Sequence, residues 1–201
     1  RGFVFAVDGL VVLGHRQGQR ISGRVAHHEV GHPHDGPADH RLPLGEDERL
    51  WYYIIVATAG HDTTSYALSG GLEQLLRHPD QLRALQADPG LAHQAAEEMI
   101  RWTSPVRSFF RWVQEDVELG GTTIPAGDVV LTSYPSANRD EAVFTDPDHF
   151  DIGRPDADKS LAFGLGMHYC LGAQVARREL RTMLNKVLAC VDTIELDGEP
   201  Q

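Results

Sequence analysis

Cysteine is scarce in this sequence, because only Cys170 and Cys190 occur among its 201 residues. Two cysteines cannot form the disulfide framework that stabilises small secreted domains. The sequence also lacks any run of about twenty apolar residues, the length of helix that a bilayer requires, and no secretory signal pattern opens it. We therefore expect a cytoplasmic protein without a membrane-spanning segment.

Positive charge is also in short supply. The chain has 18 Lys and Arg residues against 29 Asp and Glu residues, which gives a formal net charge of −11. Phosphate backbones repel a chain of this charge, so we expect no nucleic-acid partner. The hydrophobic content of 41% is sufficient for one or two globular domains. The composition therefore favours a soluble, acidic enzyme.

Residues 1–43 lack both lysine and helical periodicity. Two short apolar runs, at residues 4–7 and 9–13, are typical of strands. The segment contains six of the eleven histidines, namely His15, His27, His28, His32, His34 and His40. We leave residues 1–43 unassigned, as a disordered segment or as the product of a shifted reading frame, and treat residues 44–201 as the folded unit.

One pentapeptide in that region, His28-Glu29-Val30-Gly31-His32, has the spacing with which zinc hydrolases hold a metal ion. In such enzymes the two histidines share one face of a helix and the glutamate acts as the base. Here Gly31 interrupts the motif, and Pro33 disfavours helical geometry at His32. A zinc hydrolase is therefore the least favoured interpretation, behind loose metal binding by these histidines.

The pattern around Cys170 is the most informative about chemistry. Gly164 and Gly166 precede this cysteine, Gly172 follows it, and the next residues have helical periodicity. A glycine-rich loop thus brings a cysteine to the start of a helix, where unpaired N–H groups and the helix dipole favour a thiolate. Such a thiolate can serve as a nucleophile, as a metal ligand or as the axial ligand of haem iron. Cys190, in an apolar run, is typical of a small buried side chain.

The loop resembles the haem-binding loop of the cytochrome P450 family, and the resemblance extends from about residue 44 to about residue 198. It depends on the ordered residues Phe163, Gly164, Gly166, His168, Cys170 and Gly172. The resemblance implies haem b as the cofactor, with Cys170 as the axial iron ligand. It also implies that Phe163, Gly164 and Gly172 form the cofactor-binding loop and that His168 contacts a haem propionate.

A second motif, Ala-Gly-His-Asp-Thr-Thr-Ser at residues 59–65, lies within residues 51–76, whose pattern predicts a long helix. Gly and Thr are poor helix formers, and a local conflict of this kind often marks a functional site. The motif resembles the oxygen-activating stretch of the family, which implies that Asp62 and Thr63 deliver protons. The alternative is a structural kink, in which the Thr hydroxyls bond to carbonyl groups one turn earlier.

A third motif pairs Glu98 with Arg101, which share one face of a predicted helix. It resembles the buried Glu-x-x-Arg pair of the family, which implies Arg154 as a third member. A buried Glu between two guanidinium groups forms a structural clamp, because the loss of one member leaves an unpaired buried charge. The alternative is an exposed pair, which adds little stability.

A fourth motif, residues 105–111, ends at Arg111. The resemblance implies that Arg111 binds a haem propionate, since guanidinium groups suit carboxylates. Ser160 departs from the family, which often has a second propionate-contacting His there. Residues 117–119 and 128–132 are typical of strands. The residues that the resemblance assigns to the substrate pocket are Ala59, Gly60, Val106, Ser108 and Phe109.

The helix after Cys170 has three arginines, Arg177, Arg178 and Arg181. Arg177 and Arg181 are spaced to share one face, with Arg178 beside them. They form either a solvated face or a basic patch at which an acidic ferredoxin docks, since opposite charge speeds encounter.

The resemblance implies a mainly α fold with small β-hairpins, namely the C-terminal, haem-binding half of the cytochrome P450 fold in an incomplete form. The implied function is a monooxygenase that uses O2 to hydroxylate a small hydrophobic, terpenoid- or sterol-like substrate. Electrons would come from NAD(P)H through ferredoxin reductase and ferredoxin to a monomeric enzyme. The alternative is an inactive truncated remnant without a complete haem pocket.

Overall fold

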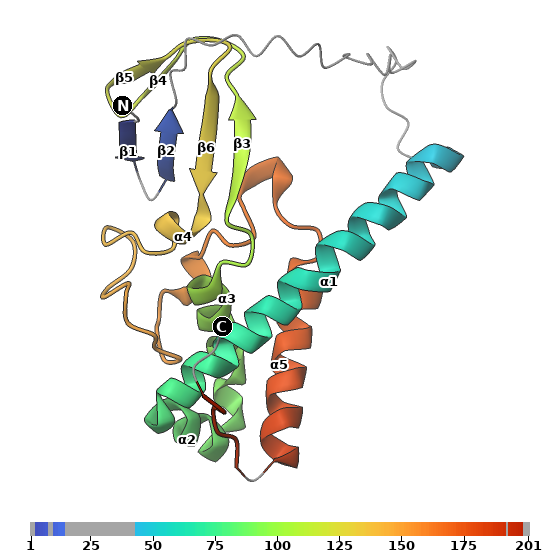
Figure 1. Ribbon diagram of the computed structural model, residues 1–201, viewed down its shortest axis with the longest axis vertical. Helices are drawn as coiled ribbons and strands as arrows, with labels where there is room; N and C mark the ends of the chain where they lie inside the picture. Colours follow the sequence, from blue (N-terminus) through green and yellow to red (C-terminus); the bar gives the residue numbers. More distant parts are fainter. Residues whose placement is uncertain (1–2, 8–9, 15–42, 192, 199–201) are drawn as a thin grey trace.

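The computed structural model describes residues 3–7, 10–14, 43–191 and 193–198, and it is mainly helical with small antiparallel sheets, as the sequence predicts. In Figure 1 the larger sheet lies at the upper left, and α1 crosses the other long helices below it. The helices are α1 (Glu46–Arg77), α2 (Pro79–Ala87), α3 (Ala92–Thr103), α4 (Tyr134–Ala137) and α5 (Ala173–Cys190). Short 3-10 turns lie at η1 (Pro89–Leu91), η2 (Ala157–Lys159) and η3 (Gly166–His168).

The larger sheet has four antiparallel strands in the order β1-β2-β6-β3. Its strands are β1 (Phe3–Val7), β2 (Leu10–Gly14), β3 (Ser108–Trp112) and β6 (Val129–Ser133). A separate hairpin consists of β4 (Val117–Leu119) and β5 (Thr122–Ile124). The strands predicted near residues 4–7 and 9–13 are therefore present, and β2 pairs with β6. The candidate zinc segment, residues 28–32, lies outside the described residues.

Helix α1 extends the predicted 51–76 helix at its N-terminus. The Gly45 N–H donates a hydrogen bond to Glu48 Oε2 at 2.8 Å, which satisfies one of the unpaired amides at the helix start. Three acidic residues in the first turn, 46–48, complement the helix dipole. The helix ends at Arg77 because Pro79 disfavours helical geometry at the residue before it and begins α2.

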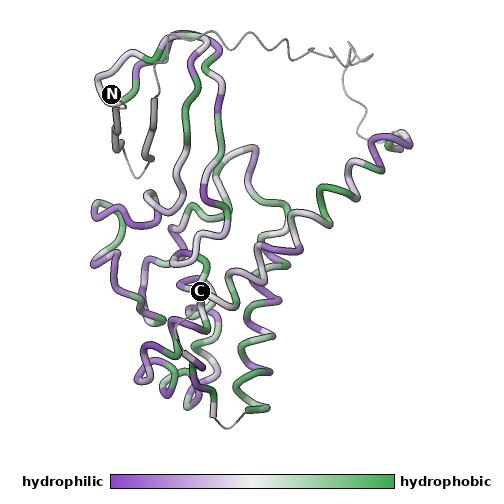
Figure 2. Tube along the Cα trace, viewed as in Figure 1, coloured by the Kyte–Doolittle hydropathy of each residue, from purple (hydrophilic) through white to green (hydrophobic). Residues whose placement is uncertain are grey.

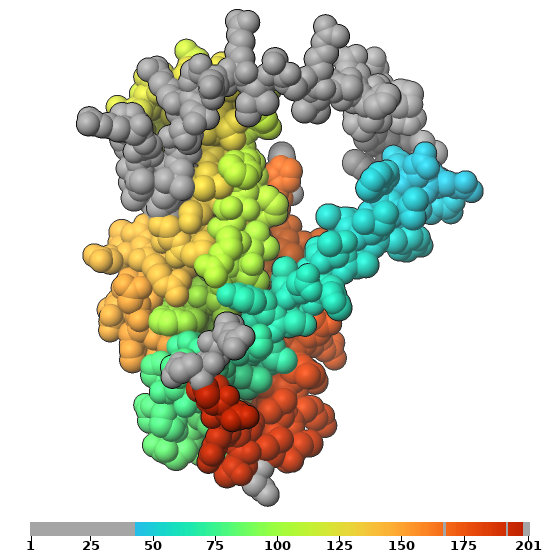
Figure 3. Space-filling view, in the orientation of Figure 1, coloured from blue at the N-terminus to red at the C-terminus, as the bar shows by residue number. Residues whose placement is uncertain are grey.

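After its charged first turn, α1 is apolar on all sides and exposed over residues 50–56. Seven consecutive residues, 50–56, each have between 45% and 67% of their surface exposed. Figure 2 shows this apolar stretch on the part of α1 that stands away from the other helices, and Figure 3 shows the same stretch in cyan. Burial within α1 begins only at Ala67. Because helices that are apolar on all sides are normally buried, this stretch calls for a covering surface that the described residues do not supply.

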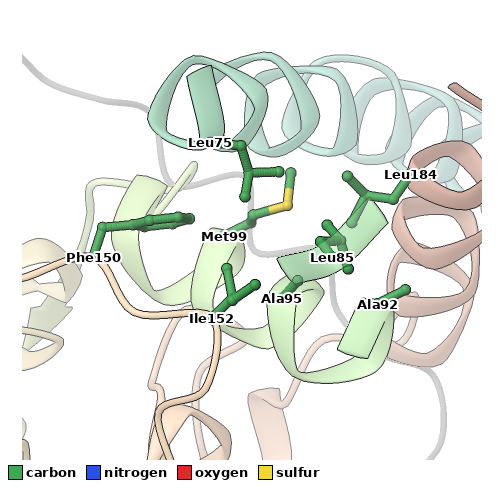
Figure 4. Packing of buried hydrophobic residues seen from close by; sticks show 8 residues of the cluster. All are labelled: Leu75, Leu85, Ala92, Ala95, Met99, Phe150, Ile152 and Leu184. Atoms are coloured by element: carbon green, nitrogen blue, oxygen red, sulfur yellow. The ribbon is translucent and has the colours of Figure 1, made fainter. Parts of the chain in front are cut away.

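The hydrophobic core lies where the second half of α1 meets α2, α3 and α5. Figure 4 shows the buried residues Leu75, Leu85, Ala92, Ala95, Met99, Phe150, Ile152 and Leu184. Gly71 permits the closest approach of α1 to α3, because a Cβ placed there would lie 2.1 Å from Met99 Cε and 2.8 Å from Met99 Cβ. The core therefore fixes α3, and with it the predicted clamp residues, against α1.

Membrane insertion is not indicated by the helices. None of those in the described ranges combines the length and the apolar character that a crossing would need.

Candidate active site

The Cys170 loop runs from Phe163 through η3 to the first turn of α5. The Cys170 N–H donates a hydrogen bond to the Phe163 carbonyl at 2.9 Å, which closes the loop. Gly164 and Gly166 have φ angles of 74° and 70°, a left-handed conformation that glycine adopts without strain. The Cys170 thiol is free and its residue is exposed. The loop thus presents a cysteine at the N-terminal end of α5, beside Gly172.

The start of the loop is anchored between α1 and the sheet. Phe163 and Ala162 pack against a buried cluster that includes Ala67 of α1. A Cβ at Gly164 would lie 3.6 Å from Tyr134 Oη, next to the end of β6. His168, by contrast, lies exposed in η3. The anchored start and the exposed Cys170 leave the thiol side of the loop open.

The prediction that Cys190 is a buried side chain is wrong. Cys190 is the last residue of α5 and is exposed. The buried residues of α5 are Ala173, Leu180 and Leu184, which follow one stripe of the helix. Cys190 lies off that stripe, and an apolar local sequence did not reveal which face it would occupy.

Asp62 and Thr63 lie near the middle of α1, which remains α-helical through the motif. The Thr63 hydroxyl donates to the Ala59 carbonyl at 2.8 Å, the back-bond to the preceding turn that the alternative interpretation predicts. The Asp62 side chain is 89% exposed, and its Oδ1 lies 3.7 Å from His61 Nε2. Gly60 also faces open space. The motif therefore has no enclosed pocket around it among the described residues.

The structure brings Glu98, Arg101 and Arg154 together in the interior. Glu98 and Arg101 have no exposed side-chain surface, and two hydrogen bonds of 2.7 and 2.8 Å join them. Arg154 Nε lies 3.3 Å from Glu98 Oε2, in a charge contact that lacks hydrogen-bond alignment. The Asp151 N–H donates to Glu98 Oε1 at 3.0 Å. One buried carboxylate therefore faces two guanidinium groups.

Both arginines of this cluster also bind backbone carbonyls of the long segment before η2. Arg101 donates to Asn138 and Pro147 at 2.7 and 2.9 Å. Arg154 donates to the carbonyls of Thr145, Asp146 and His149, at 2.6, 2.8 and 2.8 Å respectively. The cluster thus joins α3 to a segment with little regular structure, where backbone groups need such partners.

Arg111 lies on β3 opposite Val130 and is exposed. Its Nη1 donates to the Phe110 carbonyl at 3.0 Å, and its guanidinium lies 5.8 Å from the ring centre of Phe109. No carboxylate among the described residues pairs with it. Arg111 is therefore a cation that can accept an anionic partner.

The predicted pocket residues do not enclose a cavity. Val106 and Ser108 are half-buried, whereas Ala59, Gly60 and Phe109 are exposed. None of these five residues lines the surface cleft between α1 and α3 or the one along α5. In the first cleft burial lowers the pKa of Arg139, and the nearby charge of Arg101 adds to this effect. We find no group of metal-binding side chains in the described ranges.

Sequence reasoning missed one interaction, between Arg177 and Glu97. Arg177 Nε lies 2.6 Å from Glu97 Oε1, and Nη2 lies 3.1 Å from Oε2. Arg177 is therefore turned inward to α3, whereas Arg178 and Arg181 are exposed. The expectation that Arg177 and Arg181 share an exposed basic face is wrong, because Glu97 takes one of the two. The only signal in the sequence was the second acidic residue beside Glu98.

Comparison with known proteins identifies the family. Residues 90–192 match the family model described as Cytochrome P450, which is more than half of the chain. The chain belongs to the cytochrome P450 family, whose members bind haem b.

Individual relatives agree with this assignment. The chain is 45% identical over 150 residues to "Cytochrome P450-terp" of a Pseudomonas species, a match that covers 75% of this chain and 35% of the relative. It is 45% identical over 153 residues to the steroid C26-monooxygenase of Mycolicibacterium smegmatis, with coverage of 76% and 38%. The matched region thus spans well under half the length of these relatives.

Solved structures show the same fold. The crystal structure of CYP108D1 from Novosphingobium aromaticivorans superimposes with a TM-score of 0.77 at 44% identity, over 83% of this chain and 40% of that one. CYP109E1 from Bacillus megaterium, solved in complex with testosterone, gives a TM-score of 0.76 at 32% identity, over 81% and 45% of the two chains.

The residues around Cys170 fit a haem group. The exposed thiol is a suitable soft ligand for iron. Leu165 and Leu171, on either side of it in the loop, are 78% and 82% exposed, so they offer apolar surface to an apolar macrocycle. Arg111 and His168 are exposed groups of the kind that binds carboxylates.

Proposed function

We propose that this chain is the haem-binding part of a monooxygenase that hydroxylates a small, hydrophobic, terpenoid- or sterol-like substrate. The observation that carries the proposal is the exposed Cys170 thiol, which a glycine-rich loop places at the N-terminus of α5 in a chain of the cytochrome P450 family.

Three side chains would hold the cofactor. The Cys170 thiolate would ligate the iron, and Arg111 and His168 would bind the two propionates through charge-assisted hydrogen bonds. When bound, the haem supplies the oxygen chemistry, in which one atom of O2 enters a C–H bond and the other leaves as water.

Asp62 and Thr63 would supply the protons that this reaction consumes. The exposed Asp62 carboxylate can exchange protons with water. The Thr63 hydroxyl donates to the Ala59 carbonyl, so its oxygen remains able to accept a hydrogen bond from a water molecule that exchanges protons with Asp62. Rotation of that hydroxyl away from Ala59 would then pass a proton into the site.

The proposed substrate class has two supports. One is the relative whose name specifies a steroid C26-monooxygenase, at 45% identity. The other is the apolar side chain of Phe109, which shares one face of β3 with Arg111 and is 50% exposed. We place the substrate pocket on this side, with Val106, Ser108 and the α1 residues Ala59 and Gly60.

Electrons would arrive from NAD(P)H through ferredoxin reductase and ferredoxin. Arg178 and Arg181 are exposed on the helix that follows Cys170 and have no ion-pair partner in the described part of the chain. They are therefore the residues that an acidic ferredoxin would meet on the cysteine side.

The test is the spectrum of the reduced chain after haem reconstitution and addition of carbon monoxide. We expect the parent and Cys190→Ser to show the Soret band of thiolate-ligated haem, after whose wavelength the family is named. Cys170→Ser should lose this band. Both cysteines are exposed, so the comparison separates ligation from mere thiol accessibility. Identical spectra for the two variants would exclude Cys170 as the ligand.

The second candidate is an inactive remnant of the family. The observation that favours it is the exposed apolar stretch of α1, residues 50–56, which the described residues leave uncovered. A chain that takes up no haem under the same conditions would support this candidate. If the parent chain shows the thiolate spectrum, its haem site is intact, and this candidate is excluded for that site.

A further inference from the structure

One guanidinium group, that of Arg177, lies between two helices and the Cys170 loop. It contacts Glu97 of α3 through two parallel hydrogen bonds of 2.6 and 3.1 Å. Only 19% of the Arg177 side chain and 8% of the Glu97 side chain are exposed. Fork-like pairs of this kind are geometrically specific, and their burial makes an unpaired member costly. The Glu97 carboxylate therefore fixes the position of the Arg177 head group.

The same head group contacts both ends of the loop. Its Nη1 donates to Tyr169 Oη at 2.9 Å, and Tyr169 immediately precedes Cys170. Its Cζ lies 4.6 Å from the ring centre of Phe163, where the loop begins. The two rings lie 6.3 Å apart, and the Cys170 N–H bonds to the Phe163 carbonyl. Arg177 therefore contacts Phe163 and Tyr169, the two residues that flank the span 164–168 before Cys170.

Apart from the packing of Phe163, the span is otherwise held by backbone hydrogen bonds, from the Tyr169 N–H to the Gly166 carbonyl at 3.1 Å and from the Cys170 N–H to the Phe163 carbonyl at 2.9 Å. Gly164 and Gly166 are in left-handed conformations, and glycine loses much conformational entropy on ordering. Leu165 and Leu171 are almost fully exposed and add no core packing. Burial lowers the pKa of Arg177, but hydrogen bonds to Glu97 and Tyr169 outweigh it and raise the pKa above the ordinary value. The cation therefore persists at every pH at which the protein folds.

We propose that Arg177, held by Glu97, is a positioning residue that orders the Cys170 loop before the cofactor binds. It acts through Phe163 and Tyr169 and touches neither the thiol nor the iron. The pair contributes preorganisation, because the thiolate need not be ordered when the haem arrives. The part of the proposal that concerns haem rests on the proposed function, whereas the ordering of the loop does not.

The experiment is amide hydrogen exchange on the full chain without haem, resolved at Tyr169 and Cys170. The test variant is Glu97→Gln with Arg177→Met, which removes both charges together and leaves neither unpaired. The matched control is Arg178→Met, an adjacent exposed arginine on the same helix. We expect exchange at Cys170 to accelerate about ten- to a hundredfold in the double variant, the factor for the loss of a charge-assisted hydrogen bond. The control should match the parent.

Amides in the middle of α5 provide the internal reference. Unchanged exchange there, with faster exchange at Cys170, supports a local positioning role. Equal acceleration at Cys170 and in the middle of α5 would show that the Glu97–Arg177 pair supports the whole fold. Equal exchange at Cys170 in the double variant and the control would show that Arg177 does not order the loop. Either result overturns the proposal.

Two milder variants separate the contacts. Tyr169→Phe removes only the hydroxyl that Arg177 binds, and we expect a smaller acceleration at Cys170 with the Glu97 pair intact. Arg177→Lys keeps the positive charge but loses the paired guanidinium hydrogen bonds. It should therefore retain part of the protection of the Cys170 amide that Arg177→Met loses. No acceleration in Tyr169→Phe, together with full protection in Arg177→Met alone, would contradict the proposal.

A spectroscopic measurement links the loop to the cofactor. In the reduced, carbon-monoxide-treated state, the double variant should show part of its Soret absorbance at the position found for Cys170→Ser. If the parent itself binds no haem, the proposed function fails, yet the exchange experiment still decides whether Arg177 orders the loop. Haem uptake with a fully thiolate-type spectrum in the double variant would overturn the link to the cofactor.

Discussion

The buried cluster around Glu98 allows a quantitative prediction for Glu98→Ala. The substitution removes both hydrogen bonds to Arg101, the charge contact with Arg154 and the acceptor of the Asp151 N–H. Arg101 then remains buried without a carboxylate, and Arg154 keeps only its 3.4 Å contact with Asp156 Oδ1. Breaking a buried pair in this way costs about 3–5 kcal/mol, a large share of the roughly 5–15 kcal/mol that stabilises a domain. The backbone carbonyls that both arginines bind do not replace the lost charge.

The chain contains a matched control for the effect of burial. Glu73 and Arg77 form an i, i+4 pair on α1 with an Nε–Oε distance of 2.8 Å, close to the 2.7 Å of the Glu98 pair. Their side chains are 30% and 38% exposed, so solvent screens the pair. We therefore expect Glu73→Ala to cost only about 0.5 kcal/mol. The two substitutions remove the same group from an ion pair of similar length and differ in burial and in the further contacts of Glu98 with Arg154 and the Asp151 N–H.

Urea unfolding followed by circular dichroism measures the difference. With a slope of about 2 kcal/mol per molar urea, Glu98→Ala should lower the midpoint by about 1.5–2.5 M, and Glu73→Ala by about 0.3 M or less. Glu98→Gln, which keeps the shape but not the charge, extends the test if the alanine variant does not fold. Equal midpoint shifts for the two sites would refute the reasoning from burial.

Three further predictions follow from the site and the core. In a complete enzyme that carries this sequence, Thr63→Ala should retain haem but release more hydrogen peroxide and less product per NAD(P)H, and unchanged coupling would remove Thr63 from proton delivery. Arg178→Glu with Arg181→Glu should slow reduction by ferredoxin at low salt, and the difference should shrink as salt is added; equal rates at low salt would mean that the arginines form only a solvated face. Gly71→Ala should destabilise the chain by about 1–3 kcal/mol through overpacking, whereas Gly60→Ala on the open part of the same helix should stabilise it by about 1 kcal/mol. Thermal unfolding of both glycine variants checks this pair, and a loss of stability at both sites would contradict it.

The sequence was a good guide where a motif is local. The glycines before Cys170 and the helix after it are contiguous signals, and the structure contains the predicted loop and helix. The spacing of Glu98 and Arg101 on one helix face likewise indicated their contact. Because such patterns depend on neighbouring residues and helical geometry, they can be read without the tertiary structure.

Contacts between residues far apart in the sequence could not be predicted in the same way. Glu97 and Glu98 are adjacent, and only the packing of α5 on α3 decides that Glu97 pairs with Arg177, 80 residues away. Cys190 lies in an apolar run, yet the face of α5 that it occupies depends on where Leu180 and Leu184 pack. Propensity and spacing cannot assign a partner that another element supplies.

The close approach at Gly71 makes α1 a lever. Its packed part includes Gly71, where a Cβ would lie 2.1 Å from Met99 Cε, and begins at Ala67, and the motif proposed for proton delivery lies on the arm beyond Ala67. At about 1.5 Å of rise per residue, Thr63 stands about 6 Å from Ala67, so a tilt of about 10° would move it by about 1 Å. A displacement of about 1 Å at a reacting group can cost about a hundredfold in rate. Substitutions in the core beneath Gly71 would thus alter the proton delivery proposed for Asp62 and Thr63 without contacting either residue.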